Sequence, residues 1–350
     1  MKKMHIEDYG YSIGRYPKGK LNKITDVYGV KVGHYTVDTN QNKTGVTVVI
    51  PCEDNPFVTK LTAAAHVING YGKSTGLMQI DELGVIESPI FLTNTLNIGR
   101  VHDAAVELMV KQCARDHVEI KSYNPIVCEC NDAYLNDIVH RAVGEEEVFS
   151  AYEASVVDFV EGDVGAGKGM SCHQLKGGIG SASRLMDIEG ITYTIGVLVL
   201  SNHGSLEDFM ISGQPFGAKI KAIQATENEV EKGSIIIVVA TDLPVSDRQL
   251  KRLIKRVPIG LAKTGSYMGH GSGEVVIGFT TANRIPEKGN YMIDLIQDSN
   301  LDGPFHALAE AVEEAVLNSM ICSDRTEGFN GNVRESLKAY IEDLSEQKEG

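Results

Sequence analysis

The sequence predicts a sandwich of the α/β or α+β class, in which long buried strands lie against layers of helices. Segments 191–200 (ITYTIGVLVL) and 234–240 (SIIIVVA) are almost continuous runs of β-branched or aliphatic residues. Such runs are typical of strands that are buried on both faces of a sheet. Segment 305–320 indicates a strong helix, because its apolar residues recur at helical spacing. These apolar residues are Leu308, Ala311, Val312, Ala315 and Val316.

The other elements follow from shorter patterns of the same kind. We expect strands at 24–36 (alternating and broken by turns), 45–50, 124–130 and 274–280. We expect helices at 62–69, 102–115, 134–141, 249–257 and 333–344. The helix at 102–115 has a predicted apolar face made of Ala105, Leu108, Met109 and Val110.

Length and charge narrow the class of protein. The 350 residues can form one large domain or two ordinary ones, with 42% hydrophobic and 23% charged residues. A net charge of −14 disfavours nucleic acid or an anionic membrane as a partner. No apolar segment near the N-terminus suggests a secretory signal, and no apolar run is long enough to span a bilayer. We therefore expect a soluble, cytoplasmic protein with a small neutral or cationic substrate.

Six cysteines are spread along the chain, at Cys52, Cys113, Cys128, Cys130, Cys172 and Cys322. In a large chain without a signal peptide, they are expected to be reduced and buried. Cys128 and Cys130 form a C-x-C pair that matches neither a thioredoxin spacing nor a pair of zinc-ligand pairs. On a strand, the two thiols would point to the same face. The sequence thus predicts no metal site.

Two further patterns, a glycine-rich segment and the histidines, could suggest a nucleotide site or a metal site, but the details of the sequence support neither. Segment 162–169 (GDVGAGKG) resembles a phosphate-binding loop but lacks the final Ser or Thr that binds Mg²⁺. The histidines show no HExxH or similar metal-binding spacing. His270 is close in sequence to Ser272, but a histidine in a loop most often has no catalytic role. We therefore predict no cofactor.

The junction between Gly233 and Ser234 stands out from its surroundings. The acidic, polar segment 225–232 (ATENEVEK) precedes it, and a very apolar strand follows. A serine in such a place is most often a turn or strand-edge hydroxyl. However, Gly233 lacks a Cβ, so its backbone can adopt the strained geometry in which the next hydroxyl attacks the Gly233 carbonyl. The acidic segment would leave after cleavage.

A second group of polar residues lies downstream, at the head of the strand 274–280. Ser272 and Glu274 are two residues apart, so strand alternation directs both side chains to the same side. A hydroxyl and a carboxylate there could orient and polarise a nucleophile. Taken alone, the pattern also fits a glycine-rich turn before a capped strand.

The chain resembles the DmpA-type family of L-aminopeptidase/D-amidase-esterases and β-peptidyl aminopeptidases. The resemblance runs from about residue 20 to the C-terminal helices, and it lies in seven blocks in the same order. The blocks are ITDVYGVKVGHYT (24–36), LTNTLNIGRVHDA (92–104), ECNDAYLND (129–137), KGGIGSASR (176–184), GVLVLSNHG (196–204), KGSIIIVVATDLP (232–244) and GHGSGEVVIGFTTANR (269–284).

This resemblance implies a four-layer α-β-β-α sandwich of the DmpA and ornithine acetyltransferase type. It implies a single domain over residues 1–350 that cuts itself into an α chain (1–233) and a β chain (234–350). Ser234 becomes the N-terminal nucleophile, activated by its freed α-amine or by the Ser272–Glu274 pair. Asn202 matches the asparagine that donates to the oxyanion. The αβ units are expected to form a homo-oligomer.

The implied activity is that of a serine aminopeptidase or amidase acting on short peptides, amides or esters, β- or D-residues included. The chain departs from the family at 130–131, where some members carry an aromatic residue and this chain has Cys130 and Asn131. Asn131 could donate a hydrogen bond to the substrate, and Glu129 or Asp132 could hold its ammonium group. Asp132 fits a helix N-cap equally well. The alternatives are an acyltransferase of the ornithine acetyltransferase type, which Ser in place of Thr disfavours, and a non-catalytic scaffold.

Overall fold

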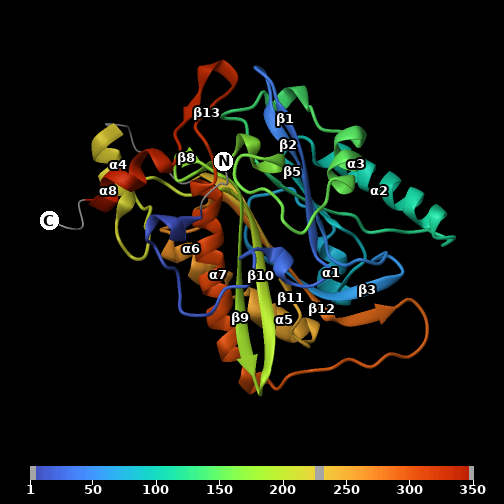
Figure 1. Cartoon of the computed structure of the whole chain (residues 1–350). Coiled ribbons are helices and arrows are strands. Elements are labelled where there is room, and N and C mark those ends of the chain that lie inside the picture. The colour runs from blue at the N-terminus through green and yellow to red at the C-terminus, as the bar shows by residue number, and fades with distance from the viewer. Residues whose placement is uncertain (1–4, 225–231, 347–350) are drawn as a thin grey trace.

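The protein is a sandwich of two β-sheets with helices on both outer faces, as the computed structural model shows (Figure 1). The structure describes residues 5–224 and 232–346. From one side to the other, the layers are helices α2 and α3, the smaller sheet, the larger sheet, and helices α5, α6 and α7. The predicted four-layer α-β-β-α sandwich is therefore confirmed.

The larger sheet carries the candidate catalytic residues Asn202, Ser234, Ser272 and Glu274. Its strand order is β4-β3-β12-β11-β10-β9, and β11 and β12 are its parallel pair. The six strands are β3 (Thr59–Gly70), β4 (Val85–Ile86), β9 (Gly178–Ile188), β10 (Ile191–Asn202), β11 (Lys232–Thr241) and β12 (Gly271–Pro286).

The smaller sheet has the order β1-β2-β5-β6. Its strands are β1 (Lys31–Asp38), β2 (Lys43–Ile50), β5 (Ile90–Asn94) and β6 (Ile126–Cys130). Two short hairpins add β7 (Ser171–Cys172) with β8 (Leu175–Lys176), and β13 (Thr326–Glu327) with β14 (Val333–Arg334).

The α-helices cover the outer faces of the sheets and the ends of the sandwich. They are α1 (Leu77–Leu83), α2 (Ile98–Arg115), α3 (Glu145–Glu153), α4 (Phe216–Gln224), α5 (Asp247–Ile254), α6 (Val257–Lys263), α7 (Asp302–Ile321) and α8 (Lys338–Glu346). Short 3₁₀ turns lie at Ile6–Tyr9, Ile24–Asp26, Ile138–His140, Gly165–Gly169, Asp298–Leu301 and Phe329–Gly331. Among the described residues, no helix combines the length and the apolar character that crossing a membrane requires.

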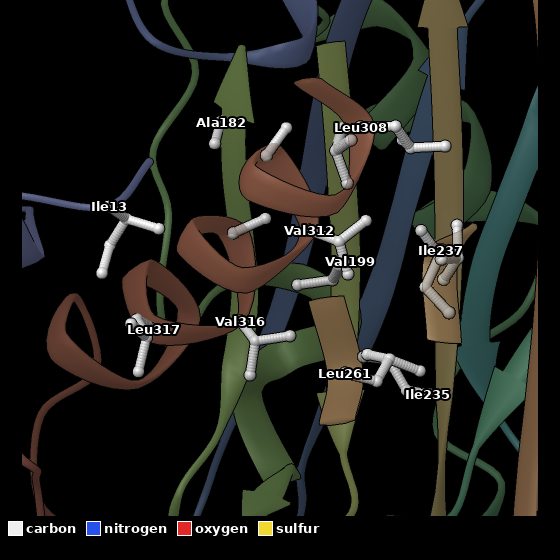
Figure 2. Packing of buried hydrophobic residues seen from close by; sticks show 14 of the residues in the cluster. Ile13, Ala182, Val199, Ile235, Ile237, Leu261, Leu308, Val312, Val316 and Leu317 are labelled. Atoms are coloured by element: carbon white, nitrogen blue, oxygen red, sulfur yellow. The ribbon is translucent and has the colours of Figure 1, made fainter. Parts of the chain in front are cut away.

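Three apolar clusters hold the layers together, and strand alternation divides the larger sheet between two of them. Ile235 and Ile237 of β11 face α7, whereas Ile236 faces the smaller sheet. Figure 2 shows Val312 and Val316 of α7 lying over β9 and β10. Residues of β11 are thus buried on both faces, as the continuous apolar run predicted. The third cluster joins α2 and α3 to the smaller sheet.

Several predicted elements differ from the structure. Residues 62–69 form part of β3, because β12 pairs with this alanine-rich segment and overrides its helical propensity. Residues 134–141 form turns and one 3₁₀ turn in place of a helix. Val110 is 39% exposed, outside the apolar face of α2. At the C-terminus, the segment predicted as one helix begins with β14 and becomes helical only at Lys338.

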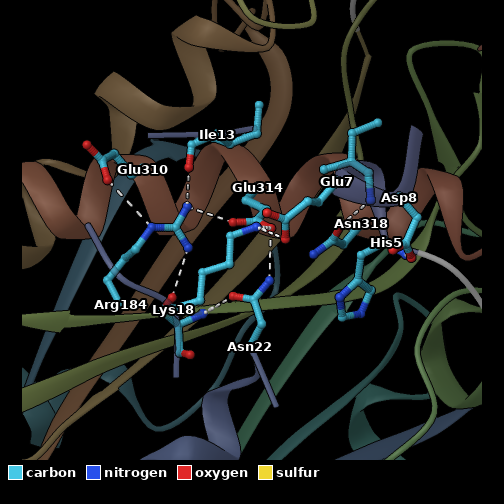
Figure 3. A network of polar contacts seen from close by, with 12 residues as sticks. His5, Glu7, Asp8, Ile13, Lys18, Asn22, Arg184, Glu310, Glu314 and Asn318 are labelled. Carbon is cyan, nitrogen blue, oxygen red and sulfur yellow. Dashed lines mark hydrogen bonds and ion pairs between the residues drawn. The ribbon is translucent and has the colours of Figure 1, made fainter. Parts of the chain in front are cut away.

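A buried polar network attaches the N-terminal segment to α7 and β9 (Figure 3). Arg184 of β9 is fully buried and forms ion pairs with Glu314 (2.6 Å) and Glu310 (3.5 Å) of α7. Lys18 pairs with Glu314 at 2.8 Å. Burial pushes the pKa of Glu314 upward, but the Arg184 and Lys18 charges outweigh it, so this pKa lies below its ordinary value.

Candidate active site

The Gly233–Ser234 junction lies at the head of β11, in the centre of the larger sheet. Ser234 pairs with Asn202 of β10 on one side and with Gly273 of β12 on the other. Strand β11 runs through both residues. The acidic segment before the junction, predicted to leave after cleavage, falls outside the described residues except for the backbone of Lys232.

Gly233 has a backbone and surroundings that exclude other residues. Its φ of 141° is one that residues with a side chain rarely adopt, and a Cβ there would lie 1.9 Å from the carbonyl oxygen of Asn202. A glycine is therefore required before Ser234 by conformation and by space.

The junction opens into a pocket of about 910 Å³, which lies in the size range of small-molecule sites. Its walls come from the end of β10, the starts of β11 and β12, the segment after β6 and the β13–β14 hairpin. The lining residues are Tyr71, Lys73, Thr95, Glu129, Asn131, Tyr134, Ser171, Gln174, Asn202, Gly204, Gly233, Ser234, His270, Gly271 and Arg334.

Ser272 and Glu274 lie on both sides of Gly273, the residue that pairs with Ser234. Both side chains are fully buried. They share one face of β12 with Val276, which packs in the cluster that faces α7. Ser234 shares the other face with Ile236, and its hydroxyl lies beside the Cys130 thiol between the sheets. The pair is thus next to the Ser234 backbone but on the opposite face from the Ser234 side chain.

Asn202 is held firmly beside Ser234. Its Oδ1 accepts a hydrogen bond from the Ser171 backbone N–H (2.8 Å), and its Nδ2 donates to the Asn131 carbonyl (2.9 Å). A side-chain amide has two N–H groups, so one N–H beyond the bond to Asn131 is available at the pocket wall. The geometry suits a donor to an oxyanion formed on a carbonyl attacked by Ser234.

The model of the family "Peptidase family S58" matches residues 22–334. The chain belongs to this family. Its similarity to a solved structure from Pyrococcus horikoshii OT3 extends over 97% of both chains, with 45% identity and a TM-score of 0.92.

Two relatives of known description match most of the length of this chain. The β-peptidyl aminopeptidase BapA of Sphingosinicella xenopeptidilytica is 34% identical over 89% of this chain and 83% of its own. The L-aminopeptidase D-Ala-esterase/amidase of Ochrobactrum anthropi, described as a prototype of the serine aminopeptidases with a variant of the Ntn-hydrolase fold, is 33% identical. That similarity covers 97% of this chain and 99% of the other, with a TM-score of 0.90. The predicted family and the predicted class, a serine aminopeptidase with a nucleophile-hydrolase fold, are confirmed.

In this S58 peptidase, two of the three residues expected to contact substrate, Glu129 and Asn131, line the pocket, and the third, Asp132, does not. Glu129 lines the pocket, and its carboxylate accepts hydrogen bonds from the Lys73 backbone N–H (2.9 Å) and from the Thr95 hydroxyl. Asn131 also lines the pocket, although its side chain accepts from the Ala133 N–H (3.0 Å). A carboxylate has about four acceptor positions, so Glu129 can still accept from an ammonium group.

Asp132 lies outside the pocket lining and is 1% exposed. Its carboxylate accepts hydrogen bonds from Thr44 (2.6 Å), Asn94 (3.1 Å) and Asn136 (3.0 Å). Burial raises the pKa of Asp132 to about 6, and these three donors lower it only partly. Asp132 therefore organises the turn after β6, where the sequence allowed a helix N-cap, and of the two carboxylates only Glu129 reaches the pocket.

The cysteines are buried and free, and Cys128 and Cys130 face the inter-sheet cluster together, as alternation predicted. Burial raises the pKa of both thiols, to about 12 for Cys128, so they are neutral packing groups. The glycine-rich segment 162–169 includes a 3₁₀ turn, and its Lys168 forms ion pairs with Asp38 (2.8 Å) and Asp163 (3.2 Å). The lysine of the phosphate-loop pattern is thereby used within the fold.

Several residues of the site were missed from the sequence. Asn69 holds the loop before β12, because its Nδ2 donates to the carbonyls of Gly269 (3.0 Å), His270 (3.2 Å) and Ser272. Thr95 lies within the quoted block 92–104 and could have been singled out there. Arg334 lies at the end of the matched region, in a segment predicted as a helix, so no pattern indicated it.

Proposed function

We propose that the chain is a precursor that cuts its own Gly233–Ser234 bond and then uses Ser234 as the N-terminal nucleophile of a serine aminopeptidase. The observation that carries this proposal is the junction itself. Gly233 and Ser234 line a pocket of about 910 Å³ at the head of a central strand, beside the amide of Asn202. A serine with a purely structural role at the start of a strand would require neither the φ of 141° at Gly233 nor a cavity in front of it.

The cleavage chemistry needs only groups that the chain supplies. The Ser234 hydroxyl loses its proton and adds to the Gly233 carbonyl carbon, and the C–N bond then breaks. The proton moves to the departing nitrogen, which leaves an ester between Gly233 and the Ser234 oxygen. Water hydrolyses this ester, so that Gly233 carries a new carboxylate and Ser234 a free α-amine and hydroxyl. Ser272 is level with Gly233 in the β11–β12 register, where it can assist this step.

In the cut enzyme, Ser234 attacks a substrate carbonyl and Asn202 donates to the oxyanion. We favour the freed α-amine, whose ordinary pKa is about 7.7–8.0, as the general base. In the β11–β12 register, the alternative pair Ser272 and Glu274 lies on the opposite face from the Ser234 hydroxyl. Glu274 and Ser272 lie on the opposite face from the Ser234 side chain but beside its backbone, so they orient the amine. Proton transfer to a general base such as this amine typically contributes 10²–10⁴-fold to a rate.

The substrates are proposed to be short peptides, amides or esters with a free N-terminal amine, including β-amino acids. Glu129 supports this class, because its buried carboxylate lines the pocket and can pair with an ammonium group. The activities for which the Sphingosinicella and Ochrobactrum relatives are named support it too. Glu129→Gln should raise KM for aminoacyl p-nitroanilides more than it lowers kcat.

The direct test is intact mass spectrometry of the purified wild type beside Ser234→Ala. Wild type should give two chains, 1–233 and 234–350, that hydrolyse L-alanyl and β-alanyl p-nitroanilides, and the variant should give one inactive chain. An acyltransferase would instead be recognised by transfer of its acyl group to an added amine. A wild type that stays in one piece and hydrolyses neither p-nitroanilide would refute the proposal.

We also propose that the cut αβ units form a homo-oligomer and that the protein is cytoplasmic. The first of these is supported by the segment after β12, where Tyr291 (51%), Met292 (98%), Ile293 (39%) and Leu295 (52%) are exposed close together. A cluster of exposed apolar residues of this kind is characteristic of protein contacts. Light scattering after gel filtration, with Met292→Lys as the variant, tests the assembly.

A further inference from the structure

The side chain of Lys73 is a cationic group of the pocket wall that the proposed mechanism does not use. Lys73 follows β3, lines the pocket and is exposed. Its Nζ lies 5.1 Å from the centre of the Tyr71 ring, and Tyr71 lines the pocket too. No carboxylate of the described residues pairs with this ammonium group. A cation on an aromatic ring is held only weakly at an exposed site, so the Lys73 ammonium can exchange the ring for an anion.

Lys73 is bonded to Glu129, the residue proposed to hold the ammonium group of the substrate. The Lys73 backbone N–H donates to Glu129 Oε1 at 2.9 Å, and the Thr95 hydroxyl also donates to this carboxylate. Glu129 is therefore fixed, and it is only 4% exposed. The Lys73 ammonium, in contrast, is a charge on a flexible four-carbon stem. The pocket wall thus presents a fixed anion and an adjustable cation on neighbouring residues.

Neighbouring opposite charges on a protein are complementary to a ligand whose own ammonium and carboxylate groups sit on one carbon atom. A free α-amino-acid head is such a ligand, and a β-aspartyl residue at the N-terminus of a peptide presents one. In this residue the peptide bond runs through the side-chain carbonyl, so the α-carboxylate stays free. Two carbons separate its ammonium group from the scissile carbonyl, as in the β-amino acids of the proposed function. A β-aspartyl residue is thus a β-amino acid with a carboxylate beside its ammonium group.

We infer that Lys73 is a carboxylate subsite beside Glu129 and that β-aspartyl peptides are a preferred substrate class. This inference rests on the proposed function. The ammonium group pairs with Glu129, the α-carboxylate pairs with Lys73, and the β-carbonyl lies at Ser234. The Ser234 oxygen adds to this carbonyl, and the amine of the next residue leaves with the proton that Ser234 gives up. Water then hydrolyses the ester, so one water is consumed and free aspartate and the shortened peptide are released.

The competing explanation is that Lys73 is a solvated side chain that only covers Tyr71. A solvated lysine treats all substrates alike, whereas a carboxylate subsite distinguishes a free carboxylate from the carboxamide at the same carbon. An ion pair between exposed groups changes affinity up to about fivefold. A charged hydrogen bond in a desolvated site changes it about tenfold or more. A bound substrate covers part of the pocket wall, so we expect an effect of at least about fivefold.

The experiment uses three p-nitroanilides that share one leaving group, in wild type, Lys73→Gln and Lys73→Arg. The substrates are β-aspartyl p-nitroanilide, its analogue with a carboxamide in place of the free carboxylate, and β-alanyl p-nitroanilide. Lys219→Gln is the matched control, because Lys219 also lies over an aromatic ring, that of Phe216 at 5.5 Å, but outside the pocket lining.

The quantity that decides is the ratio of kcat/KM for the β-aspartyl substrate to kcat/KM for its carboxamide analogue. We expect this ratio to be at least about fivefold in wild type. Lys73→Gln should reduce it to near one, Lys73→Arg should keep part of it, and Lys219→Gln should keep the wild-type value. The turnover of β-alanyl p-nitroanilide, which has no carboxylate, should change little in Lys73→Gln.

The inference is overturned if wild type hydrolyses the β-aspartyl substrate and its carboxamide analogue alike, or if Lys73→Gln slows both by the same factor. Faster hydrolysis of γ-glutamyl p-nitroanilide, which carries the same head one carbon further from the scissile carbonyl, would overturn the assignment to β-aspartyl residues.

β-Alanyl p-nitroanilide reports separately on the proposed function. If wild type hydrolyses none of these substrates, the proposed function fails, and the subsite is then judged by calorimetry on the intact protein. In that case, tighter binding of β-aspartyl p-nitroanilide than of its carboxamide analogue, lost in Lys73→Gln, supports the subsite, and equal binding overturns it.

Discussion

Two buried polar clusters lie on the larger sheet, and they differ in what their groups are bonded to. Around Arg184, each charge has an opposite charge in contact: Glu314 at 2.6 Å, Glu310 at 3.5 Å, and Lys18 on Glu314 at 2.8 Å (Figure 3). At the heads of β11 and β12, the buried Ser272 hydroxyl has no hydrogen bond within residues 5–224 and 232–346. Buried polar groups are normally satisfied. We therefore propose that the first cluster serves folding, whereas the Ser272 hydroxyl of the second serves the reaction.

If the two clusters differ in this way, substitution of the nucleophile Ser234 should have the largest effect on activity. Ser234→Ala removes the attacking oxygen and replaces a small buried side chain by another of similar size. We expect no cleavage at 233–234 and a loss of at least about 10⁴-fold in turnover, by analogy with other serine nucleophiles. The unfolding midpoint should stay within a few degrees of an uncut wild-type sample. Residual p-nitroanilide hydrolysis above a hundredth of wild type would argue for another nucleophile.

Glu274→Gln tests whether the strand-head carboxylate acts in the reaction. The substitution keeps the shape of the fully buried side chain and removes its charge. We expect kcat to fall about 10²-fold, because the α-amine loses a group that orients it, while circular dichroism and the unfolding midpoint change little. Kinetics with β-alanyl p-nitroanilide measure the first effect. Turnover equal to that of wild type would remove Glu274 from the mechanism.

Glu314→Gln should show the opposite behaviour, with a large effect on stability and a small one on catalysis. Of the acidic residues that the structure describes, it leaves the fully buried Arg184 with only the more distant Glu310 as a partner. Removing one member of a buried ion pair typically costs about 3–5 kcal/mol, which urea unfolding can measure. The surface variant Glu145→Gln is the control, expected to lose at most about 1 kcal/mol. An unfolding free energy of Glu314→Gln equal to that of wild type would contradict the proposal that the Arg184 cluster serves folding.

The smallest expected effect is a difference in acid sensitivity. The folded-state pKa of Glu314 lies below its ordinary value, so the folded state favours its ionised form. The resulting stability is fully present above the unfolded-state pKa and is lost as the pH falls through the folded-state pKa. The unfolding free energy of wild type should therefore decline more steeply than that of Glu314→Gln below about pH 4.5. Parallel acid limbs in urea titrations would contradict the assignment.

The sequence predicted the layers of the fold more reliably than its irregular parts. The strands that became β10, β11 and β12 and the helix α7 were predictable, because both their faces or one long stripe are buried. Segment 62–69 was misread as a helix, since its alanines favour a helix locally and only pairing with β12 makes it a strand. For similar reasons, the turn after β6 was misread, because its conformation depends on donors to Asp132 from distant segments.

The candidate site divides in the same way. Gly233, Ser234, Ser272, Glu274 and Asn202 lie at the ends of regular strands, where alternation and the family blocks indicate them. Tyr134 and Arg334 reach the site from a turn and a hairpin, and Asn69 from the end of β3, which was not predicted as a strand. Their positions depend on contacts between segments far apart in the chain. Local patterns contain no record of such contacts. The choice between Glu129 and Asp132 likewise needed the structure.

The most direct test of the central claim is to follow cleavage and activity together in one sample of slowly maturing precursor. The cut fraction is measured by intact mass, and activity is measured with β-alanyl p-nitroanilide at the same times. If the freed Ser234 is the nucleophile, activity is proportional to the fraction of 234–350 chain and extrapolates to zero for the uncut chain. Full activity in a sample that is still uncut would contradict the account.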